Sequence, residues 1–145
     1  MRVSIGADDT GPLTDALLGA LKERGCAVAR HGALDPGGAY SAEWASIGRA
    51  VALDVAERRA DVGIVCCWTG TGISIAANKV SGVRAALCAD AQTARGARCW
   101  NDANVLALSL RATAPAVGVE VLEAFLSTPV SDREQDRTEI AKIEL

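Results

Sequence analysis

The residues best suited to chemistry lie in segment 65–79, VCCWTGTGISIAANK. An apolar, strand-like run ends at Cys67, a Gly-rich turn follows, and a helical pattern begins at Gly72. At such a junction the first backbone N–H groups of the helix have no partner within it and attract anions. The sequence therefore predicts an anion or oxyanion site formed by the backbone of Gly70, Thr71, Gly72, Ile73 and Ser74. Cys67 precedes the helix N-terminus, which favours the thiolate, the form that acts as nucleophile or general base.

Simpler interpretations of this segment stay open. Cys66 and Cys67 can fill a buried strand while the glycines form a tight turn. A dinucleotide fingerprint would need a third glycine where Ile75 stands, and a Walker A loop would need Gly-Lys-Ser or Gly-Lys-Thr. A redox pair is disfavoured, because adjacent residues of a strand point to opposite faces of the sheet.

The elements around this segment alternate between short apolar runs and longer helical patterns, as in repeated βα units. We expect strands at 1–7, 26–31, 62–67, 83–88 and 104–108, each buried on both faces. We expect helices at 13–23, 42–58, 72–78, 91–99, 115–126 and 131–143. Crossover helices make neighbouring strands parallel, so the predicted fold is a three-layer α/β/α sandwich around a five-stranded parallel sheet. Ligands of such folds bind at the carboxyl ends of the strands.

Length and composition narrow the class of protein. The 145 residues suit one domain, 1–145, and the high hydrophobic content of 50% excludes a disordered chain. A net charge of -3 without a basic run argues against nucleic acid as a partner. No apolar stretch approaches the roughly 20 residues of a membrane span, so we expect no membrane contact and a cytoplasmic protein. Five cysteines without metal-ligand spacing and a single histidine, His31, predict neither a disulfide framework nor a metal site.

The order of motifs along almost the whole chain resembles one family. The run 69–79, TGTGISIAANK, followed by GVRAA at 82–86, is similar to the ribose-5-phosphate isomerase B and galactose-6-phosphate isomerase family of sugar-phosphate isomerases. Further matches follow in family order: Gly6-Ala7-Asp8, Tyr40, the run 101–106 (NDANVL), and Arg133 with Arg137.

The resemblance implies a Rossmann-like domain and an aldose–ketose isomerisation through a cis-enediolate, without cofactor or metal. It implies a homodimer or a dimer of dimers with active sites shared between subunits, and it places the helix at about 131–143 at the dimer interface. Cys67 matches the family's base, and Asp8 matches a contact to a substrate hydroxyl. Thr69, the loop amides and Asn101 match the groups that stabilise the enediolate oxygen. Phosphate binding is implied for Arg111, Arg133 and Arg137, although the mixed charges around the last two also suit a solvated helix face.

Departures from the family concern the substrate pocket, to which we assign Asp9, Tyr40, Trp68 and Trp100. Asp9 and Trp100 stand where most members have histidines, and Trp68 replaces a small glycine. An indole cannot donate the proton that opens a furanose ring. One hypothesis is therefore a four-carbon sugar phosphate, which needs no ring opening. The others are a ribose 5-phosphate or hexose phosphate isomerase that uses the open-chain fraction or another acid, and a catalytically silent sugar-phosphate binder or partner subunit.

Overall fold

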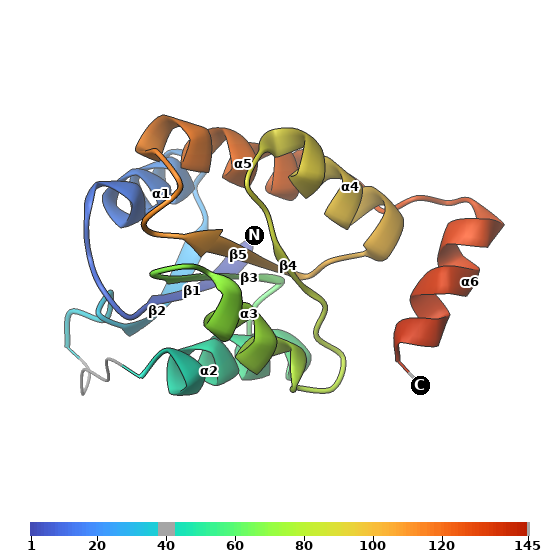
Figure 1. Cartoon of the computed structure of the whole chain (residues 1–145), viewed down its shortest axis with the longest axis horizontal. Coiled ribbons are helices and arrows are strands. Elements are labelled where there is room, and N and C mark those ends of the chain that lie inside the picture. The colour runs from blue at the N-terminus through green and yellow to red at the C-terminus, as the bar shows by residue number, and fades with distance from the viewer. Residues whose placement is uncertain (38–42, 145) are drawn as a thin grey trace.

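A computed structural model describes residues 1–37 and 43–144 of the chain. Within them, five strands alternate with helices and a sixth helix follows (Figure 1). The strands are β1 (Arg2–Ala7), β2 (Ala27–Gly32), β3 (Val62–Cys67), β4 (Ala85–Leu87) and β5 (Val105–Ser109). The helices are α1 (Pro12–Glu23), α2 (Trp44–Ala56), α3 (Thr71–Asn78), α4 (Ala91–Asn101), α5 (Pro115–Ser127) and α6 (Glu134–Ile143).

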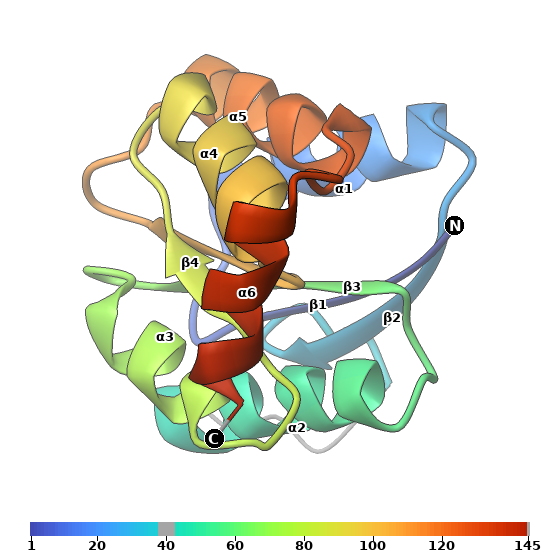
Figure 2. The same cartoon turned by 90° about the vertical axis from the view of Figure 1, so that its right-hand side faces the viewer.

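The strands form one parallel sheet in the order β2-β1-β3-β5-β4. Helices α1, α4 and α5 cover one face of the sheet, and α2 and α3 cover the other (Figures 1 and 2). Because all strands run in the same direction, the loops after β1, β3, β4 and β5 emerge at one edge. The predicted three-layer α/β/α sandwich is confirmed.

Two apolar cores, one on each face of the sheet, hold the layers together. The first packs β1, β3 and β5 against α1, α4 and α5, and it contains the fully buried Phe125. The second packs β3 and β5 against α2 and α3. The two-residue period of a strand places Cys66 in the first core and Cys67 in the second. These neighbours therefore have different surroundings and different chemistry.

The expectation that every strand is buried on both faces holds for β3 and β5 and is wrong for β2 and β4. These two strands form the edges of the sheet. Strand β4 has only 3 residues, fewer than the predicted 83–88. The Val83 N–H instead donates to the carbonyl of Val80 in a turn (3.1 Å), and the Arg84 N–H donates to Asn104 Oδ1 (2.8 Å). A side chain thus takes the hydrogen bond that would have extended the strand.

Two predicted helices begin or end elsewhere. Helix α2 stops at Ala56 because the N–H groups of Arg59 and Ala60 both donate to the carbonyl of Asp54 (2.8 and 3.0 Å), which closes its last turn; residue 42, its predicted start, lies outside the described residues. Helix α6 begins at Glu134 and not at 131. The other helices agree with their predicted bounds to within about two residues, the ordinary uncertainty of helix ends. None of the helices within 1–37 and 43–144 is long and apolar enough to cross a membrane.

Helix α6 stands apart from the sandwich, beyond α4 and β4 (Figure 1). None of its 10 residues, all of them described, is buried. Its two ends are tied to the body: the Ser131 N–H, just before the helix, donates to the carbonyl of Cys99 (2.8 Å), and Glu144, just after it, forms an ion pair with Arg84. The helix therefore leaves most of its surface open to a partner.

Candidate active site

Cys67, at the end of β3, lines a cavity of about 240 Å³. The remaining walls are Asp8, which follows β1, Trp44, which begins α2, and Trp68, Thr69, Thr71 and Gly72 between β3 and α3. Cys67 itself is only 4% exposed. The structure thus brings the three predicted catalytic residues, Asp8, Cys67 and Thr69, into one small space.

The N-terminus of α3 borders this cavity, as the Gly-rich turn predicts. Gly70 turns the chain from β3 into α3 with a left-handed conformation (φ 78°). A Cβ at this position would also lie 2.9 Å from the backbone oxygen of Leu108, so both conformation and space require glycine. The Ser74 N–H donates back to the carbonyl of Gly70 (3.3 Å), which removes it from the predicted set of oxyanion donors.

Of the first-turn residues of α3, Thr71 and Gly72 line the cavity, and no side chain among the described residues caps this helix, so their amides can face an anion. The hydroxyl groups of Thr69 and Thr71 lie 2.8 Å apart and hydrogen-bond to each other, which orients them at the cavity wall. Ile73 is fully buried, backbone included, and does not line the cavity, so the structure does not bring this predicted oxyanion donor to Cys67.

Two adjacent carboxylates follow β1, but only Asp8 lines the cavity. Burial raises the pKa of Asp8; a backbone hydrogen bond opposes this rise and the negative charge of Asp9 adds to it. The side chain of Asp9 is exposed, and its Oδ1 accepts a hydrogen bond from the Thr10 N–H (2.8 Å). Asp9 therefore acts on the cavity through its charge, not as a wall.

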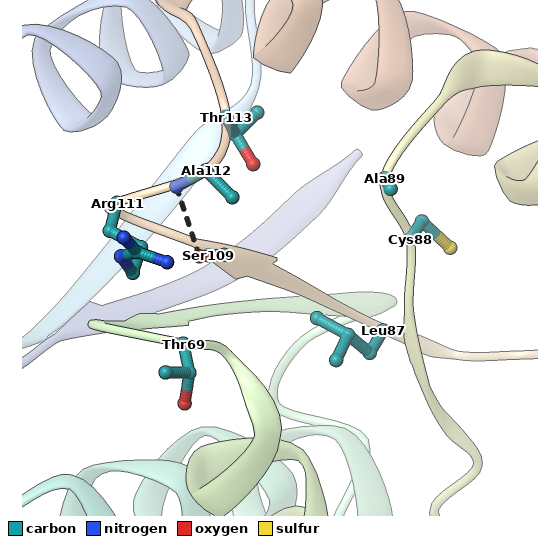
Figure 3. Close-up of a pocket in the computed structure, with 8 residues that line it drawn as sticks. All are labelled: Thr69, Leu87, Cys88, Ala89, Ser109, Arg111, Ala112 and Thr113. Atoms are coloured by element: carbon teal, nitrogen blue, oxygen red, sulfur yellow. Dashed lines mark hydrogen bonds between the residues drawn. The ribbon is translucent and has the colours of Figure 1, made fainter.

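A second cavity, of about 440 Å³, lies between the loops after β3, β4 and β5 and shares Thr69 with the first (Figure 3). It contains the predicted phosphate ligand Arg111, whose guanidinium lies 6.0 Å from the centre of the Trp68 ring. The loop that carries Arg111 is tied to the β3 loop, because Ser109 Oγ and the Arg111 N–H both donate to the carbonyl of Trp68 (2.9 and 3.0 Å). Ser109 Oγ also accepts from the Ala112 N–H (3.1 Å), shown dashed in Figure 3. A cation is thus fixed next to the Cys67 cavity.

The other buried thiols are poor candidates for a base. Burial raises the pKa of Cys66 to about 12, with further rises from Cys67 and Asp8. Cys88 lines the second cavity, but burial and the charge of Asp90 raise its pKa to about 11, and its sulfur points away from Arg111 (Figure 3). Within 1–37 and 43–144, no three His, Cys, Asp or Glu side chains are grouped to hold a metal ion.

Four predicted site residues do not lie with Cys67 in this chain. Helix α4 runs back across the sheet from β4 to β5 (Figure 1). Trp100 and Asn101, in its last turn, therefore lie near the amino ends of the strands, whereas Cys67 lies at the carboxyl end of β3. They line a separate groove of about 530 Å³ along α4 and β4. Arg133 and Arg137 belong to exposed α6, whose start is tied to the end of α4 through Ser131 and Cys99. Asn101 and the two arginines therefore share one region of the molecule, away from Asp8 and Cys67.

Trp44 is a cavity residue that the sequence did not single out. It stands 28 positions before Gly72, against which its ring packs, and no local pattern signals that contact. His31 Nε2 is hydrogen-bonded to Asp54 Oδ2 (2.7 Å) between β2 and α2, and it does not line the Cys67 cavity. Tyr40, predicted for the pocket, lies outside the described residues.

Comparison with known proteins gives the same family as the motifs. Residues 3–143 match the family model described as Ribose/Galactose Isomerase. The ribose-5-P isomerase B of Listeria innocua is 34% identical over 132 residues, which are 90% of this chain and 87% of that protein. The D-erythrulose-4-phosphate isomerase of Pectobacterium atrosepticum is 33% identical over 127 residues, 87% of this chain and 82% of that protein.

The same similarity extends to the fold. The solved structure of ribose-5-phosphate isomerase B from Clostridium thermocellum superposes with a TM-score of 0.89 at 36% identity, covering 99% of this chain and 95% of that one. The Gly-rich turn and Cys67 thus lie within the part of the chain, residues 3–143, that matches this one family model. The chain is a sugar-phosphate isomerase of the Ribose/Galactose Isomerase family.

Proposed function

We propose that the chain interconverts an aldose and a ketose form of a small sugar phosphate without a cofactor, with Cys67 as the base. The observation that carries this proposal is the shared cavity of Cys67, Asp8, Thr69 and the N-terminus of α3. A proton acceptor, a hydroxyl ligand and oxyanion donors are the groups that isomerisation through an enediolate requires.

The reaction needs one proton to move between neighbouring carbons. The Cys67 thiolate takes the proton from C2 of the aldose, and the electron pair moves onto the carbonyl oxygen at C1 to give a cis-enediolate. The first-turn amides of α3 and the Thr69 hydroxyl stabilise this oxygen, and Asp8 accepts a hydrogen bond from a substrate hydroxyl. The hydroxyl proton then passes from O2 to O1, and Cys67 returns its proton to C1 to give the ketose. No electrons are gained or lost overall.

The phosphate is held by Arg111 in the adjoining cavity and by Arg133 and Arg137 from a second copy of the chain. The positions of the predicted site residues support an active site shared between two copies. Cys67 lies at the carboxyl ends of the strands, and Asn101 and α6 lie toward their amino ends. Large apolar side chains are also left in solvent, including Trp68 (65% exposed), Ile75 (61%) and Trp100 (58%). Such residues are typical of an interface. We propose a homodimer, or a dimer of dimers, with α6 at the interface.

The second candidate substrate is a four-carbon sugar phosphate in place of a pentose phosphate. The Cys67 cavity, about 240 Å³, is smaller than the roughly 300–1,000 Å³ of ordinary ligand pockets. An aldose 4-phosphate of four carbons cannot form a five-membered ring, because its O4 is esterified, so it needs no ring-opening acid where Trp100 stands. One relative is named D-erythrulose-4-phosphate isomerase. Both candidates use the same base.

All five cysteines belong to the described residues and are free thiols, which supports a reducing compartment. We propose that the enzyme acts in the cytoplasm.

The test is solvent deuterium incorporation, followed by NMR, at C1 and C2 of four-, five- and six-carbon sugar phosphates and their unphosphorylated forms. We expect the wild type and Cys66→Ala to exchange these protons and Cys67→Ala to lose at least 1,000-fold in rate. The preferred chain length chooses between the two substrates. Binding of sugar phosphates without any exchange would refute the proposed activity and favour a silent binder or partner subunit.

A further inference from the structure

Trp44, the first residue of α2, lies flat against the start of α3. A Cβ built on Gly72 would be 3.0, 3.1 and 3.2 Å from three carbon atoms of the indole. These distances are shorter than ordinary van der Waals contact, so a methyl group at Gly72 would push the ring away from the helix by a few tenths of an ångström. The absence of a side chain at Gly72 thus lets the indole form a wall of the cavity that contains Cys67.

The position of the indole is set by packing between α2 and α3, which lie side by side beneath the sheet (Figures 1 and 2). One turn after Trp44, on the same face of α2, a Cβ on Gly48 would lie 2.8 Å from the carbonyl oxygen of Ile73. The two helices therefore touch through their backbones at this point. Helix α2 cannot move toward α3 without a clash at this point, so the backbone of Trp44 is held close to the start of α3.

Two indoles limit the same small cavity, since Trp68 lines it together with Trp44. Trp68 belongs to the loop between β3 and α3 and is 65% exposed, whereas Trp44 is 46% exposed and rests on a helix. The polar groups Asp8, Cys67, Thr69 and Thr71 form the rest of the lining. The Trp44 ring bounds this space on the side of α2, so it limits the room for the carbons of a substrate held between Cys67 and Arg111.

We propose that Trp44 is a specificity-determining residue that sets the longest carbon chain the cavity accepts. This inference rests on the proposed isomerase function and deepens it, because it assigns chain-length selection to one side chain. The indole acts through size: it fills space on the α2 side of the cavity and takes no part in proton transfer.

The experiment compares kcat/KM for four-, five- and six-carbon aldose phosphates in the full-length wild type, Trp44→Phe and Trp44→Leu. We expect the ratio of five-carbon to four-carbon activity to rise about threefold in Trp44→Phe and at least tenfold in Trp44→Leu, as the space opens. Val117→Ala, an exposed substitution on α5 in the opposite layer, is the control and keeps the wild-type ratio. Circular dichroism checks that each variant is folded, and Trp44→Phe keeps a ring should Trp44→Leu fail to fold.

Cys67-dependent deuterium exchange distinguishes failure of the proposed role of Trp44 from failure of the proposed isomerase function. Exchange in the wild type and in both Trp44 variants, with chain-length ratios constant within twofold, would overturn the role of Trp44 and leave the isomerase intact. Absence of exchange with every substrate in the wild type would instead overturn the proposed function. A rise in the ratio that follows the size order Trp, Phe, Leu supports the assignment.

Discussion

The guanidinium of Arg111 lies 6.0 Å from the centre of the Trp68 ring, at the point where the two cavities meet. Both residues belong to loops that are hydrogen-bonded to each other, since the Arg111 N–H donates to the carbonyl of Trp68 (3.0 Å). The ring face attracts the cation and limits the directions in which the side chain can point. The arrangement holds a positive charge next to the cavity that contains Cys67.

Arg111→Gln should therefore weaken phosphate binding more than it slows chemistry. A hydrogen bond to a charged group contributes about 1.5–3 kcal/mol, so we expect KM for a sugar phosphate to rise roughly 10- to 100-fold with kcat within about threefold. The unphosphorylated sugar should lose nothing. Arg30→Gln, the same substitution on the exposed edge strand β2, is the matched control. Equal losses for phosphorylated and unphosphorylated sugars would contradict this role of Arg111.

The two adjacent cysteines should differ in reactivity. The pKa of about 12 and complete burial make Cys66 inert at neutral pH, whereas Cys67 lines an open cavity. Iodoacetamide at pH 8, with peptide mass spectrometry, should label Cys67 and leave Cys66 unmodified, and a sugar phosphate should slow the labelling of Cys67. Labelling of Cys66 before Cys67 would show that the first core opens, and would weaken the assignment of the base.

The sequence predicts the parts of this site that are local in the chain. The step from β3 through Gly70 into α3 is encoded by neighbouring residues, so Cys67 and Thr69 could be placed without a structure. The contact between Trp44 and Gly72 could not, because it depends on how closely α2 packs on α3. A short apolar run also does not reveal whether its strand lies at the edge of the sheet. The sequence therefore predicts burial for β2 and β4, which are edge strands. The separation of Asn101 from Cys67 follows from the direction of α4, which returns the chain to the amino ends of the strands, and the predicted parallel βα units already imply it.

Gly70 and Gly82 offer a matched test of the Gly-rich turn, because both have positive φ (78° and 80°). An Ala at either position would cost about 1–2 kcal/mol from the left-handed conformation. A Cβ at Gly82 would meet nothing within 4 Å, whereas one at Gly70 would lie 2.9 Å from the backbone of Leu108. Overpacking adds about 1–3 kcal/mol, so urea denaturation should show Gly70→Ala to be clearly less stable than Gly82→Ala. Gly70→Ala alone should also lose isomerase activity. Equal stability losses would mean that the loop moves freely away from Leu108.

Asp54 should make stability depend on pH. Burial raises its pKa, but hydrogen bonds from Ser4 (2.7 Å), Arg59 (2.8 Å) and His31 (2.7 Å) outweigh that effect and lower it below the usual value. A depressed carboxyl pKa stabilises the fold above the unfolded value of about 3.9, and this contribution is lost as pH falls through the folded pKa.

The stability difference between wild type and Asp54→Asn should therefore stay constant, at about 2 kcal/mol, above pH 5 and should shrink below pH 4. Urea denaturation from pH 7 to pH 3 measures it. Asp15→Asn, on the exposed side of α1, should show no comparable change. A difference for Asp54→Asn that persists unchanged to pH 3 would mean that the carboxylate keeps its charge throughout this range.

A site shared between two copies predicts complementation. If Cys67 of one copy works with Arg137 of the other, then Cys67→Ala and Arg137→Ala homodimers are each impaired at both sites. In a mixed dimer, one site carries both substitutions and the other carries neither. Mixing the variants, with brief denaturation to exchange subunits, should restore activity toward one quarter of the wild-type value, because half of the dimers are mixed and each has one intact site of two.

The control is a mixture of Cys67→Ala with Asp8→Ala, two residues of the same cavity. Both substitutions then damage the site of their own chain, so neither site of a mixed dimer is intact and no activity should return. Recovery in the first mixture and not in the second assigns Cys67 and Arg137 to opposite halves of the site. Without recovery in either mixture, α6 would have to serve its own chain, which requires it to leave α4 and cross the whole sheet.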